Sequence, residues 1–271
     1  MNGHKDNLDK CKKTNNGDWT KDPALRCYIV HDKLHFFKVE VLSTKPIVLR
    51  YHNLIHRRLC KRVLGEVSHM RLERAGVVST DPKKPLQYMT NRMANSSWLD
   101  HRQEYNFNHM FNTLQRTILA LDLSKAEQFQ ILSYHPNGHY APHYDYLESN
   151  IISTVPMQGN RITTVFTILK TAKKGGTTIF PRLGLNIRPN TGDVLVWQNM
   201  EATGENDLDS IHAACPIVDG VKIGATLWVR AFGSEFRLPC TKDKKWSLEA
   251  FLKPKATWDD RVMYCKTVGP S

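Results

Sequence analysis

His143 and Asp145, followed at a distance by His212 and Lys222, constrain this chain more than any other feature of its sequence. The segment 140–147 is predicted to be a strand, in which successive side chains alternate between two faces. His143 and Asp145 would then share a face and could bind one metal ion, with His212 arriving from a distant strand. Two histidines and one carboxylate are the ligand set that holds non-haem Fe(II) and leaves coordination positions open. A lone His-X-Asp is weak, but the four residues in this order favour such a site.

The hydrophobic pattern predicts an α+β fold that is mainly β. Residues 128–232 consist of short alternating runs broken by Gly, Pro and Asn, as in a β-sandwich or barrel. Upstream, a strand-like run over 34–42 precedes a predicted helix that opens near Ser43 and Pro46 and ends at Leu64, before Gly65. A second helix is predicted over 100–121, where apolar residues recur at helical spacing and form a core-facing stripe.

One turn has a geometric consequence for the site. Asp219-Gly220 is predicted to be a hairpin turn between the strand carrying Cys215 and the strand carrying Lys222. A two-residue loop would place His212 and Lys222 on opposite faces. We therefore infer a three-residue loop or a bulge in this hairpin, near Pro216.

Length and charge bound the class of protein. The 271 residues, 41% of them hydrophobic, fit one domain or one domain with an N-terminal addition. No apolar run approaches 18 residues, so no membrane span is predicted, and the polar start 1–13 has no apolar region typical of a signal peptide. The net charge of +12 is scattered and comes without zinc-finger or RNP-type motifs. It favours a solvated basic surface over a nucleic-acid partner, with a groove for an acidic partner or extended peptide as the alternative.

A series of short motifs surrounds the four residues in a fixed order: 161–164, 175–181, 189–197, 212–216, 220–222 and 233–240. Together with Tyr134 and the stretch 96–99, this series resembles the catalytic domain of the collagen prolyl 4-hydroxylase alpha subunit family, from about Cys11 to Cys240. The family consists of Fe(II)- and 2-oxoglutarate-dependent dioxygenases that also use ascorbate. The resemblance implies a double-stranded β-helix (jelly-roll) core backed by N-terminal helices.

The resemblance also implies roles for individual residues. His143, Asp145 and His212 would bind Fe(II), and Lys222 would bind the distal carboxylate of 2-oxoglutarate. The remaining candidates for binding the cosubstrate are Tyr134, Thr164, Trp228 and Arg230. Core packing explains Thr164 and Trp228 nearly as well. The chain departs from the family at Ile168, where a Tyr is common, and at Arg230, where a His is common, and both positions are expected close to the cosubstrate pocket.

The motifs predict four regions along the chain. These are a polar N-terminal segment (1–24), a supporting region of helices and strands (25–126), the dioxygenase domain (127–240) and a C-terminal extension (241–271).

The six cysteines contain no Cys-X-X-Cys pair, so a zinc site is not expected. Isolated cysteines of this kind are usually buried free thiols. The resemblance instead implies two disulfides, Cys215–Cys240 and Cys11–Cys27, and hence the endoplasmic reticulum lumen. That location conflicts with the polar start of the chain.

The resulting hypothesis is an enzyme that 4-hydroxylates peptidyl proline, in collagen-like Gly-X-Y sequences, using oxygen and 2-oxoglutarate and releasing succinate and carbon dioxide. Its partners would be a proline-containing peptide or procollagen, and the question of protein disulfide isomerase as a second subunit stays open. The alternatives are a dioxygenase acting on another peptide and a non-catalytic pseudo-subunit. The intact set of His143, Asp145, His212 and Lys222 argues against the pseudo-subunit.

Overall fold

The computed structural model describes residues 11, 27–32, 35–78, 86–87, 91–118, 120–148, 158–232, 241–243, 245–248, 252 and 263–264. Cys240, the polar segment 1–24 apart from Cys11, and most of the predicted extension 241–271 lie outside this part of the chain. Within it the fold is mainly antiparallel β, as predicted.

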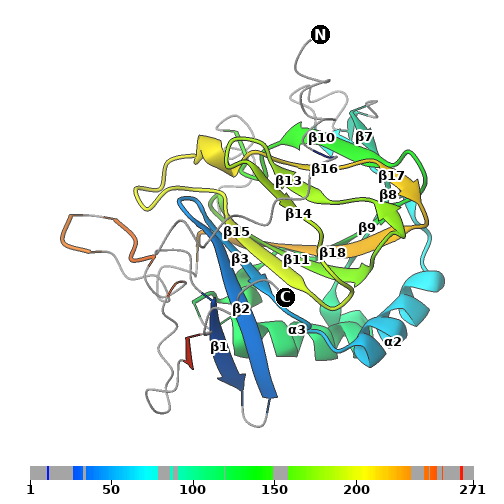
Figure 1. Ribbon diagram of the computed structural model, residues 1–271, viewed down its shortest axis with the longest axis horizontal. Coiled ribbons are helices and arrows are strands. Elements are labelled where there is room, and N and C mark those ends of the chain that lie inside the picture. The colour runs from blue at the N-terminus through cyan, green and yellow to red at the C-terminus, as the bar shows by residue number, and fades with distance from the viewer. Residues whose placement is uncertain are drawn as a thin grey trace, which may run out of the picture.

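Two antiparallel sheets face each other and form the two layers of a jelly roll (Figure 1). The larger sheet has ten strands in the order β19 (Met263–Tyr264), β1 (Cys27–Asp32), β2 (His35–Thr44), β3 (Ile47–Tyr51), β15 (Val194–Gln198), β11 (Arg161–Lys170), β18 (Lys222–Arg230), β9 (Phe129–Tyr134), β8 (Asn95–Leu99) and β4 (Glu73–Arg74). The smaller sheet has five, in the order β14 (Leu185–Ile187), β13 (Thr178–Phe180), β16 (His212–Ala214), β10 (His139–His143) and β7 (Arg92–Met93). Two short pairs complete the strands: β12 (Lys174–Gly175) with β17 (Ile217–Asp219), and β5 (Val77–Val78) with β6 (Leu86–Gln87).

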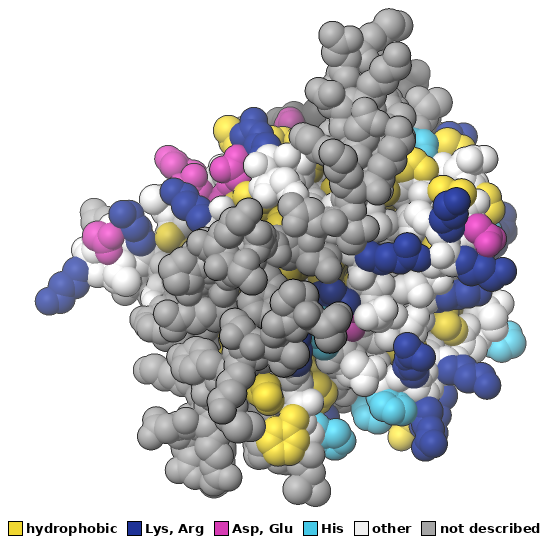
Figure 2. All heavy atoms as spheres, in the orientation of Figure 1, with side chains coloured by type: hydrophobic (Ala, Val, Ile, Leu, Met, Phe, Trp, Pro, Cys, Tyr) yellow, Lys and Arg dark blue, Asp and Glu magenta, His cyan; other side chains and the backbone are white. Residues whose placement is uncertain are grey.

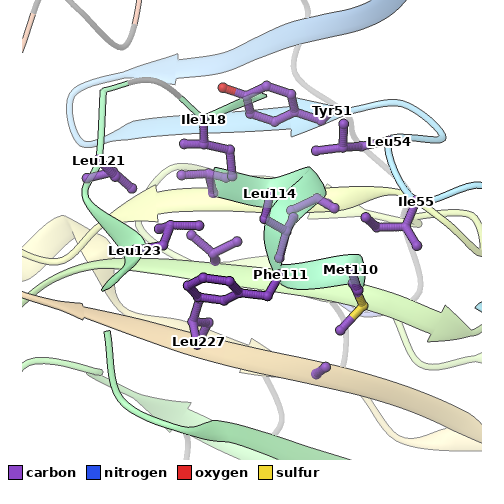
Figure 3. Packing of buried hydrophobic residues seen from close by; sticks show 14 of the residues in the cluster. Tyr51, Leu54, Ile55, Met110, Phe111, Leu114, Ile118, Leu121, Leu123 and Leu227 are labelled. Carbon is purple, nitrogen blue, oxygen red and sulfur yellow. The ribbon is translucent and has the colours of Figure 1, made fainter. Parts of the chain in front are cut away.

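Helices cover the outer face of the larger sheet, away from the smaller one (Figure 1). They are α2 (Arg57–Ser68) and α3 (Tyr105–Thr117), and short 3-10 turns occur at η1 (His101–Gln103), η2 (Leu123–Lys125) and η3 (Leu208–Ser210). The apolar stripe of α3 packs on the sheet as predicted: Met110, Phe111 and Leu114, with Ile118 just past the end of the helix, are buried in one cluster, where Phe111 lies beside Leu227 of β18 (Figure 3). Burying each such side chain contributes about 1.5–3 kcal/mol. The helix thus packs on the outer face of the larger sheet, and the inner face of the same sheet borders the site.

The helix predicted over 43–64 is wrong in its first half. Residues 47–51 form strand β3, which lies between β2 and β15 with all five side chains buried, and α2 begins only at Arg57. A central strand that is buried on both faces loses the period-two pattern and cannot be told from a buried helix by its apolar run. Gly65 lies inside α2 instead of ending it.

The hairpin predicted at Asp219-Gly220 is also wrong. Strand β17 pairs with β12, whereas β18 pairs with β9 and β11. Asp219-Gly220 is therefore a corner between two sheets, with Gly220 at φ +85°. The register of β17 with β12 does shift between Ile217 and Asp219, so the irregularity inferred near Pro216 is present, but the orientation of Lys222 is set by the register of β18 with β9.

Residues of the predicted supporting region share the larger sheet with residues of the predicted dioxygenase domain. Strands β1, β2, β3 and β8 come from 25–126, and β15 pairs directly with β3. Lys and Arg side chains are spread over the visible face with Asp and Glu among them (Figure 2). Among the described residues, no helix has the length and apolar character needed to cross a membrane.

Candidate metal centre

A cross-strand pair brings the three predicted metal ligands together. His143 is the last residue of β10 and His212 the first of β16, and the two are register partners. Asp145 follows two residues after the end of β10. The Nε2 atom of His143 lies 3.7 Å from Oδ1 of Asp145, and Nε2 of His212 lies 3.5 Å from Oδ2. One ligand atom from each of the three residues can be chosen so that all three atoms lie within 4.8 Å of one another, as a shared metal ion requires.

Backbone carbonyls orient both imidazoles. Nδ1 of His143 is 2.9 Å from the carbonyl oxygen of Ala141, and Nδ1 of His212 is 3.0 Å from that of Ser210. A ring nitrogen that faces a carbonyl carries the proton, so Nε2 of each ring is left with its lone pair for a metal. These residues fit Fe(II) in donor type, orientation and mutual distance.

The protonation states of the ligands also suit a metal. Burial and, to a smaller extent, the neighbouring His212 lower the pKa of His143 to about 3. Burial would raise the pKa of Asp145, but His212, His143 and a hydrogen bond from Thr164 together hold it below its ordinary value. His143 is therefore neutral and Asp145 ionised at neutral pH, which are the forms of these side chains that bind metals.

The triad lies in a cavity between the two sheets. Two of the predicted cosubstrate residues line it: Tyr134, whose pKa burial raises to about 12, and Trp228. The other residues that line it are Arg92, Gln130, Leu132, Tyr140, Phe166, Thr178, Trp197, Ala213, Ala214 and Thr226. The walls are thus largely aromatic and aliphatic around a small polar centre, which is typical of a small-molecule site.

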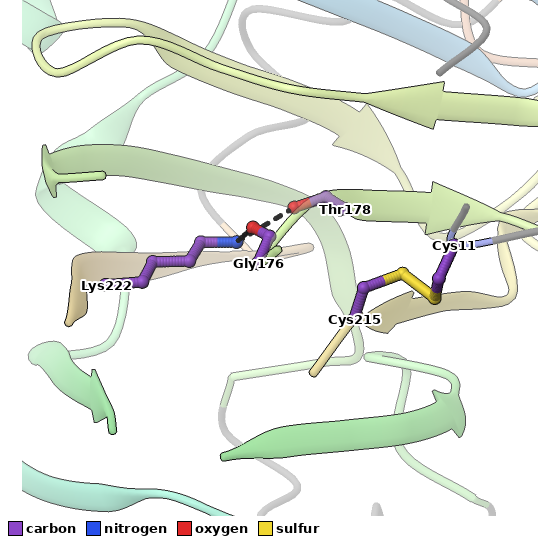
Figure 4. Close-up of a disulfide and its surroundings, with 5 residues drawn as sticks. All are labelled: Cys11, Gly176, Thr178, Cys215 and Lys222. Atoms are coloured by element: carbon purple, nitrogen blue, oxygen red, sulfur yellow. Dashed lines mark hydrogen bonds between the residues drawn. A yellow bond between two sulfur atoms is a disulfide. The ribbon is translucent and has the colours of Figure 1, made fainter. Parts of the chain in front are cut away.

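Lys222 is buried beside residues that line this cavity (Figure 4). Its ammonium donates hydrogen bonds to the carbonyl of Gly176 at 2.8 Å and to Oγ1 of Thr178 at 3.3 Å. It also lies 5.4 Å from the ring centre of Phe166, and both Thr178 and Phe166 line the cavity. Among the described residues no carboxylate pairs with it, and burial lowers its pKa to about 8. A buried cation without an anion is costly, so this ammonium is placed to receive a carboxylate from a ligand.

Gly176 makes this contact through a backbone that only glycine fits. Its φ is +72°, and a Cβ there would lie 2.5 Å from Cδ1 of Ile217. The Gly-Gly motif therefore turns a carbonyl toward Lys222 at a point where the chain packs closely.

Arg230 and Ile168 do not line the cavity of the triad, where the cosubstrate was expected to bind beside them. Arg230 donates a hydrogen bond to Oε1 of Glu127 at 2.8 Å and lines a separate cavity with Trp98 and Phe232. Ile168 is fully buried in a hydrophobic cluster with Phe166 and does not line the cavity of the triad. Both positions follow strand directions that sequence spacing alone does not fix.

Thr164 also has a different role from the predicted one. It does not line the cavity; instead its hydroxyl donates a hydrogen bond of 2.7 Å to Oδ2 of Asp145, and Asn199 donates to that hydroxyl at 2.9 Å. Thr164 thus contacts a predicted metal ligand rather than the space for the cosubstrate.

Two arginines beside the site, Arg92 and Arg161, were not predicted as site residues from the sequence. Arg92 is buried in the cavity wall, with its guanidinium carbon 4.6 Å from the ring centre of Tyr140 and its Nη2 donating to Gln130 at 2.9 Å. Arg161 lies over the ring of Trp228, 3.8 Å from its centre. Arg92 comes from the two-residue strand β7, which leaves no pattern in the sequence.

The disulfide pairing expected from the resemblance is wrong for the described cysteines. Cys215 pairs with Cys11, not with Cys240, and Cys11 is therefore not paired with Cys27 (Figure 4). The Cα atoms of Cys11 and Cys215 are 5.8 Å apart, within the range that a disulfide spans. Pairing across 204 residues depends on the tertiary fold, and connectivity cannot be deduced from cysteine spacing. Cys60 is a buried free thiol.

Comparison with known proteins agrees with this geometry. Residues 129–230, which hold all four predicted catalytic residues, match the 2OG-Fe(II) oxygenase superfamily. The prolyl 4-hydroxylase subunit alpha-2 of Caenorhabditis elegans is 34% identical over 226 residues, which cover 80% of this chain and 41% of that protein. The human prolyl 4-hydroxylase subunit alpha-1 is 31% identical over 199 residues, 73% of this chain and 37% of that protein.

Solved structures share the fold. A viral collagen prolyl hydroxylase from Paramecium bursaria Chlorella virus-1, solved with 2OG, has a TM-score of 0.50 at 19% identity and covers 68% of this chain and 96% of that one. A prolyl hydroxylase from Trichoplax adhaerens, solved with a hypoxia-inducible-factor peptide, has a TM-score of 0.51 at 13% identity and covers 72% of this chain and 88% of that one.

Residues 129–230, which carry the site, are thus similar to the 2OG-Fe(II) oxygenase superfamily. The chain is also similar to prolyl 4-hydroxylase alpha subunits, so the predicted resemblance is confirmed. The chain spans about two fifths of the length of these curated relatives.

Proposed function

We propose that this protein is an Fe(II)- and 2-oxoglutarate-dependent dioxygenase that 4-hydroxylates proline in peptides, with collagen-like Gly-X-Y sequences as the substrate class. One observation carries the proposal: the convergent triad of His143, Asp145 and His212 lies in a cavity whose wall residues Thr178 and Phe166 contact the buried ammonium of Lys222, which no carboxylate of the described residues pairs with.

The chain supplies three functions around the iron. Nε2 of His143, Nε2 of His212 and the carboxylate of Asp145 would hold it, and they leave positions for 2-oxoglutarate and oxygen. Bound iron would activate oxygen for the hydroxylation. The decarboxylation of 2-oxoglutarate to succinate would supply electrons for the reduction of that oxygen. Lys222 would anchor the distal carboxylate of 2-oxoglutarate, and the aromatic walls would exclude water from the reacting atoms.

The substrate class is supported by the relatives and by the walls of the cavity. The curated relatives are prolyl 4-hydroxylase subunits, and the solved neighbours include a collagen prolyl hydroxylase and a prolyl hydroxylase bound to a peptide. Tyr140 and Trp228 present rings to the cavity, and each is faced by a guanidinium, from Arg92 and Arg161 respectively. Aromatic faces suit a proline ring, and guanidinium groups suit peptide carbonyls.

Three further parts of the proposal concern the cell. We infer that ascorbate keeps the iron reduced and that the protein matures in the endoplasmic reticulum lumen. The Cys11–Cys215 disulfide supports an oxidising compartment. Association with protein disulfide isomerase, as a second subunit, is proposed from the kinship with the alpha subunits.

Turnover of 2-oxoglutarate tests the proposal. Succinate formation would be measured with Fe(II), ascorbate and a panel of peptides: proline-rich collagen-like repeats, the same repeats with alanine for proline, and lysine-bearing peptides. Each would be assayed with and without protein disulfide isomerase. Succinate coupled to hydroxyproline in the proline peptides alone supports the proposal.

The other outcomes separate the alternatives. Coupled turnover with a lysine-bearing or non-collagen peptide would identify a dioxygenase of another peptide. Tight binding of iron and peptide without turnover, under every condition, would identify a non-catalytic subunit and refute the enzyme.

A further inference from the structure

A chain of two hydrogen bonds in series leads from Asn199, just past the end of β15, through Thr164 of β11 to a metal ligand. The amide nitrogen of Asn199 donates to Oγ1 of Thr164 at 2.9 Å, and Oγ1 of Thr164 donates to Oδ2 of Asp145 at 2.7 Å. Asn199 and Thr164 are completely buried, and Asp145 is nearly so. We propose that Thr164 and Asn199 are positioning residues that hold the Asp145 carboxylate in one orientation for the metal.

The direction of the protons in this chain follows from the chemistry of its members. An ionised carboxylate can only accept, and a threonine hydroxyl has a single proton to donate. The NH2 group of Asn199 is a donor, so it fills the acceptor side of the hydroxyl and leaves the proton of Thr164 directed at Asp145. With its amide turned over, Asn199 would compete with Asp145 for that proton. Asn199 therefore determines that Thr164 serves the carboxylate.

The backbone holds both residues in place. Thr164 lies in the middle of β11, paired with Trp197 of β15 on one side and Trp228 of β18 on the other. The N–H of Asn199 donates to the carbonyl of Ile162 at 2.9 Å, and its carbonyl accepts from the N–H of Asp207 at 3.1 Å. Asp145, in contrast, lies beyond the end of β10 and lacks a strand of its own. The hydrogen bond from Thr164 thus connects Asp145, which lies outside the strands, to a residue in the middle of β11.

The consequence concerns how Asp145 binds. With Oδ2 engaged by Thr164, Oδ1 is the carboxylate oxygen left free for the metal, and rotation of the carboxylate is opposed. Hydrogen bonds of this kind to a metal ligand change metal affinity by about 10–100-fold when they are removed. This inference rests on the proposed metal site and adds to it the two residues that orient one ligand.

The test measures metal binding rather than turnover. Purified protein freed of metal is titrated with Co(II), and the visible absorption of bound Co(II) gives both the dissociation constant and a spectrum that reports ligand geometry. Thr164→Val keeps the shape of the side chain and removes the hydroxyl, and Thr164→Ser restores the hydroxyl. Thr167→Val is the matched control, because Thr167 lies on the same strand, is equally buried, and its hydroxyl has no hydrogen-bond partner in the described structure.

We expect Thr164→Val to bind Co(II) about 10–100-fold more weakly, with a changed spectrum. Thr164→Ser and Thr167→Val should match the wild type. Asn199→Ala tests the same chain one step further out and should fall between Thr164→Val and the wild type. It also carries the test if Thr164→Val does not fold, which circular dichroism would show.

Two results would overturn the inference, and they are distinguishable. If the wild type binds Co(II) but Thr164→Val and Asn199→Ala bind it equally well with the same spectrum, the metal site stands and the positioning role falls. If the wild type does not bind Co(II), the proposed function fails and the positioning role fails with it.

Discussion

Replacing Lys222 by Met tests two effects of its buried charge separately: the loss of folding stability that the charge causes, and its contribution to the binding of 2-oxoglutarate. Lys222 is 2% exposed, and its hydrogen-bond partners in the described structure are both neutral, a carbonyl and a hydroxyl. Burial lowers its pKa from 10.5 to about 8. At about 1.4 kcal/mol per pKa unit, keeping this ammonium charged at pH 7 costs the ligand-free protein about 3 kcal/mol. Met is close in length and carries no charge, so Lys222→Met removes that cost.

The pH dependence gives the sign. Between pH 8 and pH 10.5 the unfolded chain binds a proton at Lys222 that the folded chain has released. The free energy of unfolding of the wild type therefore rises with pH through this window, and that of Lys222→Met lacks this contribution. Urea unfolding of both proteins at pH 7 and pH 10.5 should show the wild type gaining most of about 3 kcal/mol relative to the variant. Tyrosines and other groups titrate in both proteins and cancel in the difference.

The contribution of the Lys222 charge to ligand binding is measured by adding 2-oxoglutarate. In protein loaded with Co(II), 2-oxoglutarate should raise the unfolding midpoint of the wild type far more than that of Lys222→Met, because a ligand stabilises in proportion to its affinity. 2-Oxopentanoate, which has the same chain without the distal carboxylate, should stabilise both proteins alike. A difference in stability between wild type and variant that stays constant from pH 7 to pH 10.5 would refute the buried-charge argument. An equal response of both proteins to 2-oxoglutarate would refute Lys222 as its anchor.

Three other perturbations follow from the geometry. His143→Ala or Asp145→Ala should abolish stoichiometric Fe(II) binding, measured by metal analysis after desalting, while circular dichroism stays that of the wild type, because two ligands compete poorly with water. Cys11→Ser should lower the free energy of unfolding by about 2–4 kcal/mol, and non-reducing peptide mapping of the wild type should recover a Cys11–Cys215 peptide; a Cys215–Cys240 peptide instead would contradict the structure. Arg230→Ala should leave the Michaelis constant for 2-oxoglutarate unchanged, because Arg230 contacts Glu127 outside the cavity of the triad; an increase as large as that in Lys222→Ala would show that the anchor has moved.

The parts of this fold that follow from sequence are those set by local periodicity and by motif order. Helix α3 was predictable because its apolar stripe repeats at helical spacing. The metal ligands were predictable from the order of the motif residues, although the strand predicted over 140–147 is wrong beyond His143, where β10 ends, and Asp145 lies outside it. Strand β3 was not, because a strand buried on both faces carries no alternation. The corner at Asp219-Gly220 was not, because the same turn residues serve a hairpin and a change of sheet.

The contacts of Arg92, Asn199 and Cys11 could not be predicted for a different reason. Arg92, Asn199 and Cys11 act through partners 16 to 204 residues away in the chain: Arg92 bonds to the carbonyl of Gly76, Asn199 to Thr164, and Cys11 to Cys215. None of them belongs to a motif, since each depends on which strands become neighbours. Such contacts are products of the sheet order, and only coordinates reveal them.

The arrangement of the site explains why a jelly roll can hold reactive chemistry with few polar residues. Its ligands come from the ends of β10 and β16, where backbone carbonyls orient the imidazoles, whereas Lys222 is the first residue of β18, a central strand of the larger sheet. The ends of strands allow close convergence, and the central strands supply fixed positions. Asp145 has the first property but lacks the second, and the hydrogen bond from Thr164 provides it. A site built in this way should lose metal geometry before it loses its fold, which is the order of events that the Thr164→Val and Asp145→Ala variants are designed to reveal.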